Sequence, residues 1–320
     1  MSDRYNILPR PHDGGYIATA IGVGPDRLPS LKQRCGKVLG YMSSKILVLG
    51  STGTIGRPLV AGLLARGEAV RAASRSGQSL GGAEGVVFDF TDPDTIAPAF
   101  DGVDRVYVLM PAGFTAVQDL LLPVVGEAAR RDVKIVFQSA TSADADDDNP
   151  YRQVELAIEK SGSPFVILRP NWFSDNFHNF WKQGLDHGTI ALPAGDSKTS
   201  FIDARDIAES AAAVLASSAF DGRAFDLNGP EALTYTEAAA ILSTVIGTPI
   251  QYTAISDDAF IDMLKSAGVP AENAAAMASI FSPVREGWTG RLTDDVEILT
   301  GRAPRTLETY AVDNASLLMA

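Results

Sequence analysis

The sequence predicts an α/β protein of the Rossmann type, a doubly wound parallel sheet with a smaller C-terminal α/β cap. Two observations carry this prediction. Short apolar runs alternate with helical segments along the first half of the chain, which is typical of successive βαβ units. The first apolar run, KILVL at residues 45–49, leads directly into a glycine-rich loop and then into a helix, the order that a dinucleotide-binding unit requires.

The strands of the core are expected at apolar runs that suit burial on both faces of a parallel sheet. KILVL and FVILR are continuous runs of this kind. The expected strands lie at residues 45–49, 69–73, 86–89, 105–109, 134–138 and 165–169, with a late strand at 223–227.

Helices are expected between these strands. Pro58 suits the first turn of a helix, and Gly67 and Gly162 suit positions just after a helix. In the first half we expect helices at residues 57–66, 92–100, 117–132 and 151–161. After Pro170 the alternation breaks, and we expect helices at 171–181, 207–215, 235–246 and 259–267, with strands at 201–202 and 250–254.

The chain divides into three predicted parts. Residues 1–41 lack sustained periodicity and read as a poorly structured N-terminal extension. A dinucleotide-binding domain follows over residues 42–320. Its core is expected at about 42–170 plus 200–228, and a substrate cap at about 171–199 and 229–320.

Composition narrows the function classes. Hydrophobic residues make up 46% of the chain and charged residues 21%, as in ordinary globular proteins. The formal net charge of −12 gives little support to a nucleic-acid partner. No run approaches the roughly 18 apolar residues of a membrane span. With one cysteine and three histidines, no metal site is expected. We expect a cytoplasmic protein, a monomer or homodimer, that acts on a small molecule.

The glycine-rich loop is the strongest sign of a ligand. Gly50, Gly53 and Gly56 form G-x-x-G-x-x-G between a strand and a helix, and Thr52, Thr54 and Ile55 lie between them. Glycines allow a sharp turn and a close approach of a pyrophosphate, which the N–H groups of the following helix can bind. The alternative is a tight turn that needs glycine for geometry alone.

The end of the second strand favours NADP(H) over NAD(H). An NAD site usually carries an acid about 20 residues after the glycines, to bind the ribose 2′-OH. Here Ser74, Arg75 and Ser76 stand in that place, and a cation can pair with a 2′-phosphate. The alternative is that Arg75 is a solvated surface charge. Further candidates at strand ends, each also compatible with an ordinary loop, are Asp89 and Phe90 beside the adenine and Met110 and Pro111 along the cofactor.

Several stretches together resemble the NmrA-like branch of the atypical short-chain dehydrogenase/reductase superfamily. They are LGSTGTIGRPLV at 49–60, the strand end at Arg75, VELAIEKSGSPFVILRPNWFSDNF at 154–177 and SFIDARDIAESAAAVL at 200–215. This branch includes quinone oxidoreductases, a triphenylmethane-dye reductase and non-catalytic NADPH-sensing regulators. The resemblance implies a Rossmann core with a small, variable C-terminal substrate domain. It also implies that Pro170, Asn171, Trp172 and Phe173 line the nicotinamide side.

The sequence departs from the superfamily at its catalytic pair. Typical members use Tyr-x-x-x-Lys, in which the lysine lowers the pKa of the tyrosine. Here Tyr151 is followed by Glu155, and the alternative register offers Asp147 and Tyr151. Tyr151 therefore remains only as an accessory proton donor. Ser139, just after the fifth strand, occupies a place where the superfamily often keeps a Ser or Thr near the substrate carbonyl.

Aromatic residues after Pro170 suggest a pocket for a planar acceptor. If residues 171–181 form a helix, Phe173, Phe177, Phe180 and Trp181 share one face. Phe173, Phe177 and Trp181 would line a substrate pocket there. The alternative is core packing between the two parts of the protein. Asp203 and Asp206 are expected to cap the following helix.

Two functions agree with these patterns. The first is an NADPH-dependent reductase that passes hydride to a quinone or similar conjugated acceptor without the usual Tyr–Lys pair. The second is a non-catalytic NADP(H)-sensing regulator.

Overall fold

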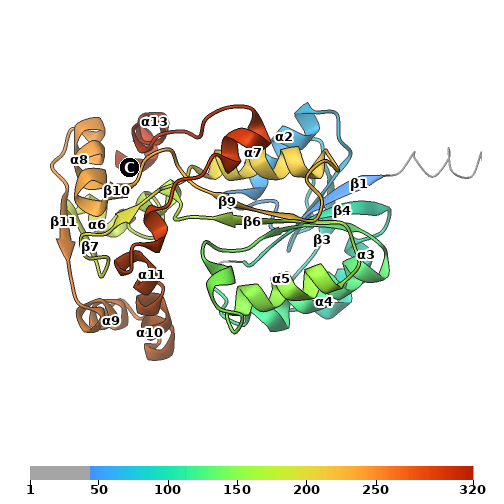
Figure 1. The fold of residues 1–320 in the computed structure, drawn as a ribbon, viewed down its shortest axis with the longest axis horizontal. Helices are drawn as coiled ribbons and strands as arrows, with labels where there is room; N and C mark the ends of the chain where they lie inside the picture. Colours follow the sequence, from blue (N-terminus) through green and yellow to red (C-terminus); the bar gives the residue numbers. More distant parts are fainter. Residues whose placement is uncertain (1–43, 112, 320) are drawn as a thin grey trace, which may run out of the picture. The chain divides into compact units, whose positions relative to one another are not determined.

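A parallel sheet of seven strands forms the centre of the computed structural model, which describes residues 44–111 and 113–319. The predicted extension at residues 1–41 lies outside the described residues. The strand order is β3-β2-β1-β4-β5-β6-β9 (Figure 1). The strands are β1 (Lys45–Val48), β2 (Val70–Ser74), β3 (Glu84–Val87), β4 (Val103–Leu109), β5 (Lys134–Gln138), β6 (Phe165–Pro170) and β9 (Arg223–Leu227). This arrangement confirms the predicted fold class.

Helices cover both faces of the sheet, which is why its central strands are apolar throughout. Along β1, Ile46 and Val48 face one hydrophobic cluster and Leu47 faces the other. Helices α2 (Gly56–Ala65) and α7 (Ala204–Leu215) lie on one side, and α3 (Ile96–Ala99), α4 (Val117–Arg130) and α5 (Pro150–Lys160) on the other (Figure 1). No helix within residues 44–111 and 113–319 has the length and apolar character needed to cross a membrane.

The strand order creates a crevice beside β1. The chain passes from β1 to β2 and β3 on one side, and then crosses back to pair β4 with the other side of β1. All these pairings are parallel. In such a sheet the loops that leave the carboxyl ends of β1 and β4 run in opposite directions, and ligands bind between them.

The cap has its own hydrophobic core around two small strand pairs. β7 (Thr189–Leu192) pairs in parallel with β11 (Gln251–Ala254), and β8 (Lys198–Thr199) pairs antiparallel with β10 (Leu233–Thr234). Its helices are α6 (Lys182–Asp186), α8 (Tyr235–Ile246), α9 (Asp257–Ser266), α10 (Ala271–Ser279), α11 (Ser282–Arg285), α13 (Leu307–Asp313) and α14 (Ala315–Met319).

One helix inside the predicted cap range packs elsewhere. Helix α12 (Asp295–Thr300) buries Val296 and Leu299 in the cluster that contains α2 and α7. The chain therefore returns from the cap to the sheet before it enters α13. The range 229–320, predicted as cap, includes this helix of the core.

The predicted helix at 171–181 is wrong. Residues 171–173 stay extended because their backbone bonds to neighbouring segments: Ser174 donates its N–H to the carbonyl of Ile202, and Ile202 donates to Trp172. A single 3₁₀ turn, η4 (Ser174–Phe177), follows, and α6 begins only at Lys182. The predicted strand at 201–202 is a single bridge between Ile202 and Phe173.

Candidate functional site

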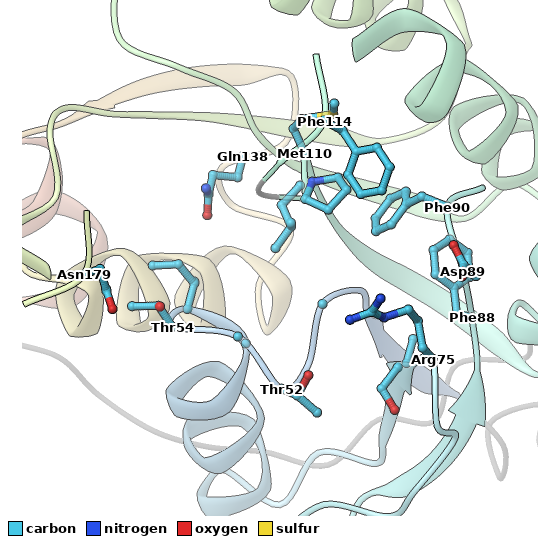
Figure 2. Close-up of a pocket in the computed structure, with 18 of the residues that line it drawn as sticks. Thr52, Thr54, Arg75, Phe88, Asp89, Phe90, Met110, Phe114, Gln138 and Asn179 are labelled. Atoms are coloured by element: carbon cyan, nitrogen blue, oxygen red, sulfur yellow. The ribbon is translucent and has the colours of Figure 1, made fainter. Parts of the chain in front are cut away.

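A cavity of about 850 Å³ opens at the carboxyl ends of the central strands (Figure 2). Thirteen of the residues that line it carry predicted roles, namely Gly50, Thr52, Gly53, Thr54, Ile55, Gly56, Ser74, Arg75, Asp89, Phe90, Met110, Pro111 and Phe173. Phe180, from the predicted aromatic cluster, also lines the pocket. Other lining residues were not singled out from the sequence, namely Ala73, Phe88, Thr91, Leu109, Phe114, Gln138, Asp175, Asn176 and Asn179. The lining thus brings together strand ends that are far apart in the chain.

The glycine loop between β1 and α2 forms the floor of the pocket. Gly50 has a φ of +64°, which favours glycine. A Cβ at Gly56 would lie 2.2 Å from the carbonyl oxygen of Gly50, so only glycine fits there without a shift of the backbone. Helix α2 begins at Gly56, and its first N–H groups lack helical partners. This geometry suits a pyrophosphate and fits the cofactor expected at this loop.

Arg75 marks one end of the pocket, which we call the β2–β3 end (Ser74, Arg75, Phe88, Asp89, Phe90 and Thr91). Its guanidinium is exposed and points into the pocket (Figure 2). Among the described residues, no carboxylate forms an ion pair with Arg75. A cation without a protein partner is available for an anionic group of a ligand. Ser76 is exposed and lies outside the pocket lining.

The same end offers a carboxylate and two aromatic rings. Hydrogen bonds from the backbone and side chain of Thr91, with the nearby charge of Arg75, hold the pKa of Asp89 below its ordinary value. The rings of Phe88 and Phe90 meet edge to face, with centroids 4.8 Å apart. An ionised acceptor of hydrogen bonds beside aromatic faces suits a heterocyclic base.

The opposite end of the pocket, the β4–β6 end, contains neutral amides and apolar side chains. Its residues are Met110, Pro111, Phe114, Gln138, Phe173, Asp175, Asn176, Asn179 and Phe180. None of these lining residues is Lys, Arg or His. Within the described part of the chain, the side-chain amides of Asn176 and Asn179 have no hydrogen-bond partner.

Tyr107 orients the amide of Gln138. The Tyr107 side chain is fully buried, and its hydroxyl donates to Oε1 of Gln138. Burial keeps the pKa of Tyr107 far above its ordinary value, so the phenol remains a donor. With the amide oxygen engaged, the –NH₂ group of Gln138 is left to face the pocket as a donor.

The 3₁₀ turn η4 separates the side chain of Phe173 from that of Phe177. A 3₁₀ helix repeats every three residues, so Phe173, Asn176 and Asn179 fall on one side. All three line the pocket. Phe177 lies about 120° away from Phe173 on such a turn. It is completely buried against Trp181 and Phe201 in the core of the cap.

Asp175 lies in the same turn and is almost fully buried, with 9% of its surface exposed. Its Oδ2 accepts a hydrogen bond of 3.1 Å from the N–H of Ala204, at the start of α7. Burial raises the pKa of Asp175 to about 6, and the charge of Asp203 adds to this, against the opposing effect of the Ala204 hydrogen bond.

Several residues predicted to line the site lie outside the pocket lining. Asn171 is buried, and its side-chain nitrogen donates to Ser200, Asn228 and the carbonyl of Thr289. Trp172 stacks on Trp181 in the core of the cap, with centroids 5.7 Å apart. The others outside the lining are Pro170, Phe177 and Trp181. For Phe177 and Trp181 this follows from the extended backbone at 171–173, where the sequence predicts the start of a helix.

The residues predicted for catalysis also lie outside this lining. Tyr151 packs against the core beneath the sheet, and burial raises the pKa of its phenol. Ser139 is buried beside Glu155. Burial opposes ionisation of Glu155, but hydrogen bonds from Arg169 and Arg152 hold its pKa below the ordinary value. Glu155 is therefore an ionised carboxylate in a buried ion pair with Arg169.

The residues missed from the sequence share a weak signal. Asp175, Asn176 and Asn179 are polar residues inside an aromatic stretch, and Gln138 is the polar last residue of an apolar strand. Polar side chains in such places need partners or a cavity. This signal names candidates but gives no direction for their side chains.

Comparison with known proteins places this fold and pocket in a family. The model of the NmrA-like family matches residues 42–310, and the chain belongs to that family. The uncharacterized oxidoreductase YesF of Bacillus subtilis is 32% identical over 273 residues, covering 85% of this chain and 95% of the relative. An NAD(P)H azoreductase of Xenophilus azovorans is 30% identical over 282 residues, covering 85% and 98%.

A solved structure agrees over nearly the same length. The NADPH-dependent quinone oxidoreductase of Escherichia coli superposes with a TM-score of 0.73 at 25% identity, and the match covers 86% of this chain and all of that one (100%). These three proteins are oxidoreductases by name, and the protein is an enzyme of this class.

Proposed function

We propose that the protein is an NADPH-dependent reductase that transfers hydride to a planar, conjugated acceptor such as a quinone. The observation that carries the proposal is the continuous pocket between two unlike ends. The glycine loop and Arg75 suit a phosphorylated dinucleotide. The β4–β6 end suits an uncharged or cationic aromatic molecule.

The preference for NADPH rests on the β2–β3 end. An acid at the end of β2 would accept from a ribose 2′-OH and repel a 2′-phosphate. Arg75 stands there instead, exposed, directed into the pocket and without an ion-pair partner in the described ranges. A charge-assisted contact of this kind favours the phosphorylated cofactor.

The acceptor class rests on the β4–β6 end. Phe114 and Phe180 expose 47% and 69% of their surfaces while lining the pocket. Flat faces of this kind suit stacking with a conjugated ring. The –NH₂ of Gln138 is a donor for a carbonyl or azo group of the acceptor. Without Lys, Arg or His in this lining, carboxylate and phosphate substrates are disfavoured.

The relatives support the same class of reaction. By their names, the relative from Xenophilus azovorans is an NAD(P)H azoreductase and the enzyme from Escherichia coli is a quinone oxidoreductase. Reduced nicotinamide supplies the hydride in such chemistry, and the protein orients the acceptor and excludes water. The absence of a Tyr–Lys pair is compatible with acceptors that need little help from a strong proton donor.

The direct test is oxidation of NADPH and NADH by the purified protein with quinones, enones, azo compounds and cationic dyes. We expect saturable, protein-dependent oxidation with at least one conjugated acceptor, and faster turnover with NADPH than with NADH. Tight NADPH binding without oxidation across the panel would contradict the proposal.

A further inference from the structure

Asp175 is the one titratable side chain that lines the β4–β6 end of the pocket in the described structure. The other titratable lining residues, Arg75 and Asp89, belong to the β2–β3 end. Tyr151 and Ser139, the residues of the expected catalytic positions, do not line the pocket. A proton for a bound acceptor must therefore come from Asp175 or from water.

The position of Asp175 is fixed by the fold. It follows β6 by way of the extended residues 171–173, and the N–H of Ala204 holds its Oδ2 in place. The N-terminus of α7 does not need this second carboxylate as a cap, because the side chain of Asp203 already accepts from the N–H of Arg205. Asp175 is thus a buried acid, held at one oxygen, whose remaining surface borders the pocket.

The charged surroundings favour a protonated carboxyl. Asp203 lies close enough to oppose ionisation of Asp175. Arg205 has the opposite effect, but its guanidinium is bound by Asp203 and Asp313. From α13, Tyr310 faces the same region and hydrogen-bonds with His178. Burial raises the pKa of Tyr310 and lowers that of His178, so it favours the neutral form of each side chain. With burial as the main cause, the pKa of Asp175 lies at about 6.

We propose that Asp175 donates the proton that accompanies hydride transfer to the acceptor, in place of the missing Tyr–Lys pair. This inference rests on the proposed reductase function. A quinone gains a hydride, with its two electrons, from the dihydronicotinamide and a proton from the Asp175 carboxyl. The products are the hydroquinone and the oxidised nicotinamide, and the Asp175 carboxylate then takes a proton back from water.

Two acceptors separate proton donation from hydride transfer. Reduction of a quinone needs a hydride and a proton. Reduction of a cationic triphenylmethane dye needs only the hydride, because addition to its central carbon gives a neutral product. Asn at position 175 retains an oxygen for the N–H of Ala204 but cannot donate a carboxyl proton. Asp186→Asn is the matched control, since Asp186 ends α6, pairs with Lys182 and lies outside the pocket lining.

We expect Asp175→Asn to lower kcat for the quinone by about a hundredfold, and to leave kcat for the dye within about twofold. NADPH binding, followed by fluorescence titration without acceptor, should be unchanged. Asp186→Asn should match the wild type in all three measurements. Equal loss of both activities would assign Asp175 a structural role and overturn the inference, as would unchanged quinone turnover.

Measurements on the wild type keep the inference testable if Asp175→Asn does not fold. The kcat for the quinone should fall as the pH rises through about 6, while kcat for the dye should not. A carboxyl ¹³C resonance of the protein should titrate with the same midpoint. Identical pH profiles for the two acceptors would contradict proton donation by Asp175. If neither acceptor is reduced, the proposed function itself fails, and the role of Asp175 with it.

Discussion

A single side chain, Arg75, sets the expected choice between NADPH and NADH. We predict that Arg75→Ser lowers the affinity for NADPH by about 10- to 100-fold and changes that for NADH by no more than about twofold, because only NADPH loses a charge-assisted contact. Titration of both cofactors measures the effect. Arg66→Ser, an exposed cation at the other end of α2, is the matched control. Equal weakening of both cofactors would exclude a role in binding the 2′-phosphate.

Asp175 should also lower the stability of the fold. Its pKa in the native state, about 6, lies above the ordinary 3.8, so the native protein binds this proton more tightly than the unfolded chain. The free energy of unfolding therefore decreases as pH rises from about 4 to about 6, and the loss persists above that range.

The variant Asp175→Asn cannot ionise and escapes this loss. At pH 8 we expect it to raise the free energy of unfolding by about 1–3 kcal/mol, with little difference from the wild type near pH 4. Urea denaturation at both pH values measures the difference. A variant that is less stable than the wild type at pH 8 would show that the Asp175 carboxylate stabilises the fold.

Side-chain direction is the part of the site that the sequence could not provide. In the segment NWFSDNF at 171–177, Phe173, Asp175 and Asn176 line the pocket, whereas the predicted site residues Asn171, Trp172 and Phe177 do not. An α-helical period groups Phe173 with Phe177, whereas a 3₁₀ period places them about 120° apart. The backbone bonds between residues 172–174 and Ile202 that cause this difference join distant segments, so local pattern gives no sign of them.

At the scale of elements, the β1–loop–α2 unit depends on one close backbone contact. We predict that Gly56→Ala weakens NADPH binding by at least about tenfold and destabilises the protein, because its Cβ would lie 2.2 Å from the Gly50 oxygen. Gly62→Ala, in the same helix, is the matched control. Its nearest neighbour is the end of the Arg66 side chain at 3.8 Å, so it should stabilise the protein by about 0.5–1 kcal/mol. Thermal unfolding and NADPH titration of both variants measure the difference. Equal stability and equal NADPH affinity of Gly56→Ala and Gly62→Ala would contradict the close contact at Gly56.

Elements with strong local signals were predictable from the sequence. Helix α8 has the predicted bounds, since Thr234 and Glu237 form a capping box at its start and Gly247 follows its end with a φ of +74°. The glycine loop has signals of the same kind. The two-residue strands β8 and β10 and the short helices α11 to α14 were missed because their formation depends on packing within the cap and against α7.

At the scale of the whole described structure, an ion-pair cluster joins the C-terminal segment to helix α7. Asp206, in α7, is completely buried and pairs with Arg302 and Arg305, just before α13 of the cap. Its Oδ2 also accepts a 2.7 Å hydrogen bond from the backbone of Arg305. Of the two residues predicted to cap this end of α7, only Asp203 does so, and Asp206 holds the C-terminal segment instead.

We predict that Asp206→Asn lowers the free energy of unfolding by about 3 kcal/mol, because it leaves two arginines without their buried partner. Glu209→Gln affects the same arginines, but Glu209 is 36% exposed, so its loss should amount to at most about 1 kcal/mol. Denaturant unfolding of both variants gives the comparison. Equal losses of unfolding free energy in the two variants would mean that the burial of Asp206 does not strengthen its ion pairs.

The proposed function requires direct hydride transfer from NADPH to a conjugated acceptor bound at the β4–β6 end. The most direct measurement uses NADPH deuterated at the transferable position of C4, with a cationic triphenylmethane dye as the acceptor. The hydrogen added to the central carbon of the dye does not exchange with water, so mass spectrometry records its origin. We predict one deuterium in each reduced dye molecule. Reduced dye without deuterium, or bound NADPH that reduces no dye, quinone or azo compound, would contradict the claim.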